Sequence, residues 1–136
     1  IKLFEFQIGD HRGQQVWESL CMLIALRLWK SYWFDRPTVL CTKADNVTTL
    51  VLISCLKAKG GGTGIIAREL ALDLGEAAHA PAMRQHISGI ENSTCDSLSR
   101  LFQPGKNYQV PPSVSHLRPD SVPDRPRSWY KSLGSC

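Results

Sequence analysis

Three acidic residues stand where their carboxylates could take part in chemistry. Glu18 lies in a stretch, residues 16–29, that is otherwise almost entirely apolar. Asp45 follows a run of β-forming residues, and Asp96 stands at the start of a late apolar pattern. Carboxylates that converge on one spot bind hard divalent cations such as Mg²⁺, because oxygen ligands suit these ions and their charge offsets the repulsion between the acids. Two such ions can stabilise both the attacking and the leaving oxygen of a phosphodiester.

Each of these carboxylates also has a structural explanation. Glu18 would lie near the start of a helix, where the helix dipole favours an acid. Asp45 could cap the helix that follows it. The run from Ser93 to Asp96 fits the S/T-x-x-D/E capping box, in which the acidic residue belongs to the first turn. For each side chain taken alone, a role in metal binding and a structural role at a helix start both stay open.

Local patterns predict the elements that would position these residues. Apolar residues recur at helical spacing from Gln14 to about Trp33, and a second apolar set predicts that most of this helix is buried. β-branched residues after Pro37 predict a strand that ends at residues 44–46. The other predicted elements are a strand at 1–8, helices at 47–56, at 63–78 and at about 94–102, and a strand at 82–87. Thr63 is expected to cap the helix that it begins.

The composition is typical of a folded domain with a packed core. The chain has 136 residues, of which 43% are hydrophobic and 21% charged, so global disorder is not expected. Its five cysteines form no C-x-x-C pair and no cluster at zinc spacing. We interpret them as reduced thiols of an intracellular protein, four of them filling the core. No apolar run reaches membrane-spanning length without a charge, and we expect no signal peptide. The missing initial Met predicts a fragment or a processed product.

The composition changes at residue 103. Six of the eight prolines lie in residues 103–136, together with five basic and two acidic residues. Because proline interrupts helices, we divide the chain into a domain, residues 1–102, and an extended, basic, Pro-rich tail, residues 103–136. The tail is expected to dock as an arm, anchored by Trp129 and Tyr130, or to gain order on a partner. Its charge is compatible with a polyanion partner.

The order of these motifs resembles the ribonuclease H domain of retroelement reverse transcriptases. The matching segments are VWESLCMLIALRLW, KADNVTTL, IARELALDL and QHISGIENSTCDSLSRLFQPG, and the resemblance covers about residues 1–105. Its most specific parts are the spacing from His86 to Asp96 and the D-x-L-S-R that begins at Asp96. The resemblance implies an α/β, ribonuclease H-like fold and metal-dependent cleavage of the RNA strand in RNA–DNA hybrids.

The same resemblance implies roles for single residues. Glu18, Asp45 and Asp96 correspond to three of the family's four metal-binding carboxylates, with Mg²⁺ or Mn²⁺ as the cofactor. His86 corresponds to the family's mobile histidine, which is thought to assist product or proton handling, and Asn92 to an asparagine of the same loop. A retroelement product would act in the nucleus or the cytoplasm.

The sequence departs from the family at its beginning. The family's first metal-binding Asp lies on its first strand, whereas the one strand predicted before Glu18 corresponds to the family's third. Neither Glu5 nor Asp10 stands where the first Asp should. We therefore expect a ribonuclease H-like fold that lacks its first two strands, in a chain that is impaired as a nuclease by itself. The alternative is a domesticated, non-catalytic and metal-free structural subunit in a larger assembly, in which neighbouring protein chains complete the open sheet edge.

Overall fold

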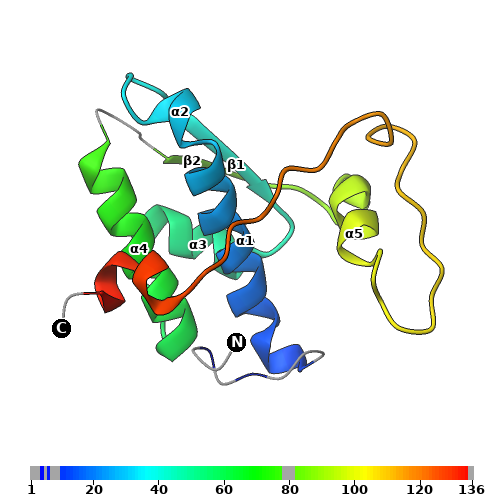
Figure 1. Cartoon of the computed structure of the whole chain (residues 1–136), viewed down its shortest axis with the longest axis horizontal. Coiled ribbons are helices and arrows are strands. Elements are labelled where there is room, and N and C mark those ends of the chain that lie inside the picture. The colour runs from blue at the N-terminus through cyan, green and yellow to red at the C-terminus, as the bar shows by residue number, and fades with distance from the viewer. Residues whose placement is uncertain (1–3, 5, 7–9, 78–81, 135–136) are drawn as a thin grey trace.

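Among the residues that the structure describes, helices dominate and two short strands form a sheet (Figure 1). The computed structural model describes residues 4, 6, 10–77 and 82–134. Within them lie, in chain order, η1 (His11–Gly13), α1 (Gln14–Leu28), α2 (Lys30–Trp33), β1 (Leu40–Ala44), α3 (Val47–Cys55), α4 (Gly61–Glu76), β2 (Ala82–His86), α5 (Ser93–Ser99), η2 (Arg127–Trp129) and η3 (Lys131–Leu133), where η denotes a 3-10 helix. The strand predicted at residues 1–8 falls outside the described residues, apart from Phe4 and Phe6. None of the helices in the described ranges is long and apolar enough to cross a membrane.

The two strands pair in parallel. Their register runs from Leu40 beside Ala82 to Ala44 beside His86. Parallel neighbours need a crossover connection, which α3 and α4 supply, and α3 packs against both strands. The carboxyl ends of both strands therefore lie at the same end of the sheet, which brings the residue after Ala44 close to His86.

One face of helix α1 is fully buried. That face packs against α4 and α3 in a core that contains Val16, Leu20, Leu23, Leu52, Ile66, Ala67 and Leu70. The prediction that most of the helix is buried holds in part: Met22 and Leu26 are half-buried and pack against the same core, whereas Cys21 is exposed. Cys21, Met22 and Leu26 also line one wall of a cavity.

The cysteines do not fill the core as predicted. Cys21, Cys41, Cys55 and Cys95 are exposed free thiols. They lie on sides of their elements that face away from the core formed by α1, α3 and α4. Cysteine has a small side chain with a weak S–H donor and is tolerated at exposed positions. The residue type alone therefore did not show whether these cysteines are buried.

The helix predicted from Gln14 to Trp33 is divided at Trp29 into α1 and α2. The indole Nε1 of Trp33 donates to the carbonyl oxygen of Leu26 at 3.0 Å. Trp33 is thereby buried against the end of α1, while Trp29 stays half-exposed beside the cavity. Trp29 at the break and Tyr32 and Trp33 of α2 all line the same cavity.

Helix α4 begins two residues before its predicted cap. Gly60 precedes the helix with a φ of 103°, a conformation that L side chains rarely adopt. This turn starts the helix at Gly61, and Thr63 lies inside the first turn. Its hydroxyl donates to the carbonyl oxygen of Lys59 at 2.8 Å, so Thr63 does not act as the expected N-cap.

Helix α5 is shorter than predicted and lacks the predicted capping box. It runs from Ser93 to Ser99, with Asn92 at the N-cap position and no side-chain hydrogen bond to the first turn. The Asp96 carboxylate instead accepts a hydrogen bond from Arg100 Nε at 3.0 Å. The donor to Asp96 is thus the side chain of Arg100, one turn further along, and not a backbone N–H group of the first turn.

The tail leaves α5, forms a wide loop and returns across α1 to α4 (Figure 1). Residues 100–126 contain no helix or strand and are mostly exposed. The chain then forms η2 and η3, and η3 packs against α4. The last part of the tail is therefore joined to the domain that it follows.

Candidate functional site

A cavity of about 960 Å³ lies between α1, β1 and the start of α5. The acidic residues in its lining are Glu18, Asp45 and Asp96, the three carboxylates identified from the sequence. The lining also includes Asn92 and Lys43. Helix, strand end and late helix thus bring three acids that are distant in sequence to the wall of one cavity.

Glu18 is held in place by two amide side chains. Its Oε1 accepts a hydrogen bond from Gln14 Nε2 at 2.9 Å, one turn earlier on α1. Its Oε2 accepts one from Asn46 Nδ2 at 2.5 Å. The carboxylate is half-buried, and these two bonds fix its direction toward the end of β1.

Asn46, and not Asp45, caps α3. Its Oδ1 accepts hydrogen bonds from the backbone N–H groups of Thr48 at 2.8 Å and Thr49 at 3.4 Å. The same amide donates to Glu18, so one side chain starts a helix and positions an acid. The structural explanation considered for Asp45 therefore belongs to its neighbour, and the exposed Asp45 side chain remains at the cavity.

His86 lies beside Asp45 because the two strands end together. Its Nε2 is 3.2 Å from the Asp45 carbonyl oxygen, a hydrogen bond in the tautomer that is protonated at Nε2. His86 is exposed, so its ring is open to solvent. The contact follows from the pairing of Ala44 with His86 in the sheet.

The turn before α5 is held by Glu91. Its carboxylate accepts hydrogen bonds from the backbone N–H and the hydroxyl of Ser88, each at 3.0 Å. These bonds hold the pKa of Glu91 below its usual value. Asn92 and Asp96 follow directly and line the cavity. Asp96 is half-exposed and paired with Arg100, and this hydrogen bond raises the pKa of Arg100 above its usual value.

The three carboxylates do not form a ready-made metal cage. Within residues 10–77 and 82–134, no three His, Cys, Asp or Glu side chains lie close enough together to hold a metal ion. Glu18 binds two amide groups and Asp96 a guanidinium group. Carboxylate oxygens are suitable donors for Mg²⁺ or Mn²⁺, but in this arrangement they do not fit one ion.

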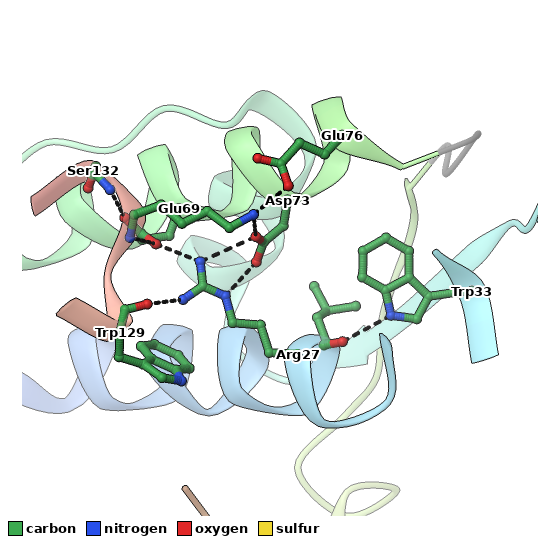
Figure 2. A network of polar contacts seen from close by, with 9 residues as sticks. Arg27, Trp33, Glu69, Asp73, Glu76, Trp129 and Ser132 are labelled. Carbon is green, nitrogen blue, oxygen red and sulfur yellow. Dashed lines mark hydrogen bonds and ion pairs between the residues drawn. The ribbon is translucent and has the colours of Figure 1, made fainter. Parts of the chain in front are cut away.

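A buried ionic network fastens α1, which carries Glu18, to α4. Figure 2 shows Arg27 of α1 facing Glu69 and Asp73 of α4. Arg27 Nη2 donates to Glu69 Oε2 at 2.5 Å, and Arg27 Nε donates to Asp73 Oδ2 at 2.7 Å. Both acids are buried, which is tolerated only when the charges are paired and hydrogen-bonded. The network therefore joins α1, which forms one wall of the cavity, to α4.

The same network captures the C-terminal segment. Glu69 also accepts hydrogen bonds from the backbone N–H groups of Lys131 at 2.8 Å and Ser132 at 2.6 Å. Lys131 Nζ pairs with Asp73 at 2.8 Å. Burial raises the pKa of the Glu69 carboxyl, but the hydrogen bonds from Ser132, Arg27 and Lys131 outweigh burial and hold this pKa below its usual value.

Trp129 and Tyr130, the two residues identified from the sequence as tail anchors, lie at this clasp. The Arg27 guanidinium carbon is 4.3 Å from the Trp129 ring centroid, and Arg27 Nη1 donates to the Trp129 carbonyl oxygen at 2.8 Å. Tyr130 is 3% exposed, and its ring packs edge-on against Phe4 with centroids 6.0 Å apart. A cation–π contact and a buried ring thus fasten the segment together with the backbone bonds to Glu69.

Two sets of residues that are important in the structure were not identified from the sequence. Asn46 carried a usable signal, because an Asn directly before a helical pattern is a preferred N-cap. In the sequence, Arg27 is only a charged residue in an almost entirely apolar stretch, residues 16–29. Glu69 and Asp73 are four residues apart and thus share a helix face, but their partners in α1 and in the tail could not be identified from that spacing. In comparisons with family models, curated proteins and solved structures, no match to this chain was found.

Proposed function

We propose that this chain is a ribonuclease H-like module of a retroelement, in which Glu18, Asp45 and Asp96 form part of a nuclease site. The observation that carries the proposal is the single cavity whose wall holds all three acids and Asn92. The order helix, strand end and late helix, and the parallel pairing of β1 with β2, agree with the sequence resemblance. The proposed substrate is the RNA strand of an RNA–DNA hybrid.

The chain by itself is proposed to be impaired in this activity. The family's first strand and its Asp have no counterpart in the matching segments of this chain. The three acids that are present do not come close enough together, among the described residues, to hold one ion. In this proposal, the chain positions side chains of the nuclease site. Asn46 and Gln14 direct Glu18, and the paired strand ends place His86 at Asp45.

Cleavage of a labelled RNA–DNA hybrid in the presence of Mg²⁺ or Mn²⁺ tests the proposal. We expect little or no cleavage by the 136-residue chain, and restored cleavage when an upstream segment supplies a strand that carries the missing Asp. Asp45→Asn should abolish the restored activity. Asp35→Asn, at an exposed position outside the cavity lining, should leave it unchanged and serves as the matched control.

Two outcomes would contradict this proposal in different ways. Strong cleavage by the unmodified chain, lost in Asp45→Asn, would show that the missing strand is not needed. No cleavage after the strand has been added, with the complex shown to form, would refute the nuclease function.

A second candidate is a structural subunit that docks into a larger assembly without cleaving nucleic acid. The observation that favours it is the edge of β1 opposite β2, since the sheet has only these two strands in the part of the chain that the structure describes. Two-stranded sheets are marginal by themselves, and unpaired edges tend to recruit further strands. Binding of a partner without any hybrid cleavage would support this candidate.

A further inference from the structure

The charges in the cavity lining do not balance. Among the described residues that line it, Glu18, Asp45 and Asp96 are acidic and Lys43 is basic. Arg100, which stands outside the lining, pairs with Asp96. Even when Arg100 is counted, the acids outnumber the cations. The cavity therefore carries a net negative charge, which favours a cation inside it.

Asp45 is the acid in this lining whose charge has no partner. Glu18 accepts hydrogen bonds from the neutral amides of Gln14 and Asn46, which fix its direction and leave its charge in place. The exposed Asp45 side chain forms no hydrogen bond and no ion pair with any described residue. Both carboxylates are thus available to a positively charged group.

A buried hydroxyl group in the same lining also lacks a partner. Thr49 lines the cavity and is 2% exposed, and its Oγ1 has no hydrogen-bond partner among the described residues. Thr49 belongs to the first turn of α3, whose cap, Asn46, binds Glu18. The hydroxyl group is therefore at the acidic end of the lining. Burying a polar group without a partner is unfavourable, and a ligand donor that reaches this oxygen removes that cost.

Aromatic side chains form the other end of the lining. Trp29 and Tyr32 are 52% and 74% exposed, and Trp33 lines the cavity beside them. At 1.5 Å per helical residue, Trp29 lies about 16 Å from Glu18 along α1. Half-buried apolar side chains of α1 form the wall between the two ends. The cavity is thus elongated in its chemistry, acidic at one end and aromatic at the other.

We infer that this cavity binds a small, elongated organic cation, with its ammonium group at Glu18 and Asp45 and its apolar body directed along α1 toward Trp29 and Tyr32. The inference goes beyond the proposed function. It uses two acids of the proposed nuclease site, but binding of the cation requires neither a metal ion nor a nucleic acid.

The lining favours such a ligand over other occupants. Its volume of about 960 Å³ is typical of sites for small molecules. A metal ion does not fit, because no three acids, His or Cys among the described residues lie close enough together to hold one. An anion would be repelled by the acids, and a neutral apolar molecule would leave Asp45 and Thr49 without partners. Trp and Tyr rings suit the body of a cation, since they pack against apolar groups and also attract positive charge.

The test titrates the full chain with phenylalkylammonium ions of increasing linker length and follows the indole N–H signals by NMR. The signals of Trp29 and Trp33 should shift, whereas those of Trp17 and Trp129, which stand outside the lining, should not. We expect dissociation constants of about 0.1–1 mM, with tighter binding for the longer linkers that reach both ends. The phenylalkyl alcohol of the same length should bind about tenfold more weakly, and only the binding of the ion should weaken as salt is added.

Variants separate the two ends of the site. Asp45→Asn should weaken binding of the ion by about threefold to fivefold, because the carboxylate is exposed, and should leave binding of the alcohol nearly unchanged. Asp35→Asn, at an exposed position outside the lining, is the matched control and should change neither. Tyr32→Ala, at a position where folding does not depend on the ring, should weaken the ion and the alcohol alike.

Several outcomes would overturn the inference. These are no shift of Trp29 and Trp33, equal affinity for the ion and the alcohol, and an Asp45→Asn variant that binds the ion as the natural chain does. A peptide that carries the same ammonium group on a lysine serves as competitor. If it binds more than about tenfold more tightly than the free ion, the occupant is a protein segment and the inference is refuted. Hybrid cleavage is assayed separately, so the nuclease proposal and this inference can fail independently.

Discussion

Replacing Glu69 by glutamine should loosen the C-terminal clasp. The Glu69 carboxylate is fully buried and accepts hydrogen bonds from Arg27 Nη2, from the N–H of Lys131 and from the N–H of Ser132. Glutamine has nearly the same shape, but one of its two terminal atoms becomes an NH₂ group. That group would face donors, so at least one of the three bonds must be lost.

The size of the effect follows from these contacts. A hydrogen bond to a charged group contributes about 1.5–3 kcal/mol, and leaving a buried donor without a partner costs about 1–3 kcal/mol. Removing one member of a buried ion pair costs about 3–5 kcal/mol when the other charge is left uncompensated. Arg27 keeps Asp73 as a partner, so we expect the lower end, a loss of about 3 kcal/mol. This is a large part of the ~5–15 kcal/mol by which domains are usually stable.

Urea unfolding measures the loss, and limited trypsin digestion locates it. In Glu69→Gln, cleavage after Arg127 and Lys131 should become faster, because the segment around them is released. Glu76→Gln is the matched control. Glu76 is about half-exposed and pairs with the same Lys131 side chain at 2.6 Å, and such exposed pairs contribute about 0–1 kcal/mol. Equal unfolding and equal digestion of the two variants would refute the clasp.

Three more predictions concern the same contacts and the cavity wall. The folded-state pKa of Glu69 lies below its ordinary value of 4.5. The stability that ionised Glu69 contributes is therefore present above pH ~4.5 and is lost as the pH falls through the lower folded-state pKa. The urea midpoint of the natural chain should fall over this pH range, and that of Glu69→Gln should fall less. Asn46→Ala removes the α3 cap and a Glu18 partner and should cost about 1–2 kcal/mol, whereas Asn107→Ala, at an exposed tail position, should cost almost nothing in the same urea assay. Tyr130→Ala should cost about 3–5 kcal/mol by thermal or urea unfolding, since it removes a buried ring, and Tyr32→Ala, at a residue 74% exposed, should be close to neutral; equal losses for either pair would contradict the packing described.

The sequence by itself determined most of the local structure. The helical spacing of apolar residues predicted α3 and α4, and β-branched residues predicted β1, each with boundaries that agree within a few residues. The same spacing predicted the start of α1, but the structure divides that predicted helix at Trp29. These features depend on neighbours within one or two turns, so the pattern that encodes them is contained in a short window. The errors at Thr63 and at Ser93 are of the same local kind, because a glycine turn at Gly60 and an ion pair with Arg100 displaced the expected caps.

Only the tertiary structure decided what the polar residues do. The sequence identified Glu18, Asp45 and Asp96 as candidates, but folding was needed to bring them to one cavity and to give Glu18 its partner Asn46. Likewise, the sequence shows Arg27 only as a charge within an apolar helix. Folding places Glu69 beside Arg27 and brings the C-terminal segment to Glu69. The physical reason is that a charge enters the interior only with a partner, and that partner is selected by how the elements pack, not by its distance along the chain.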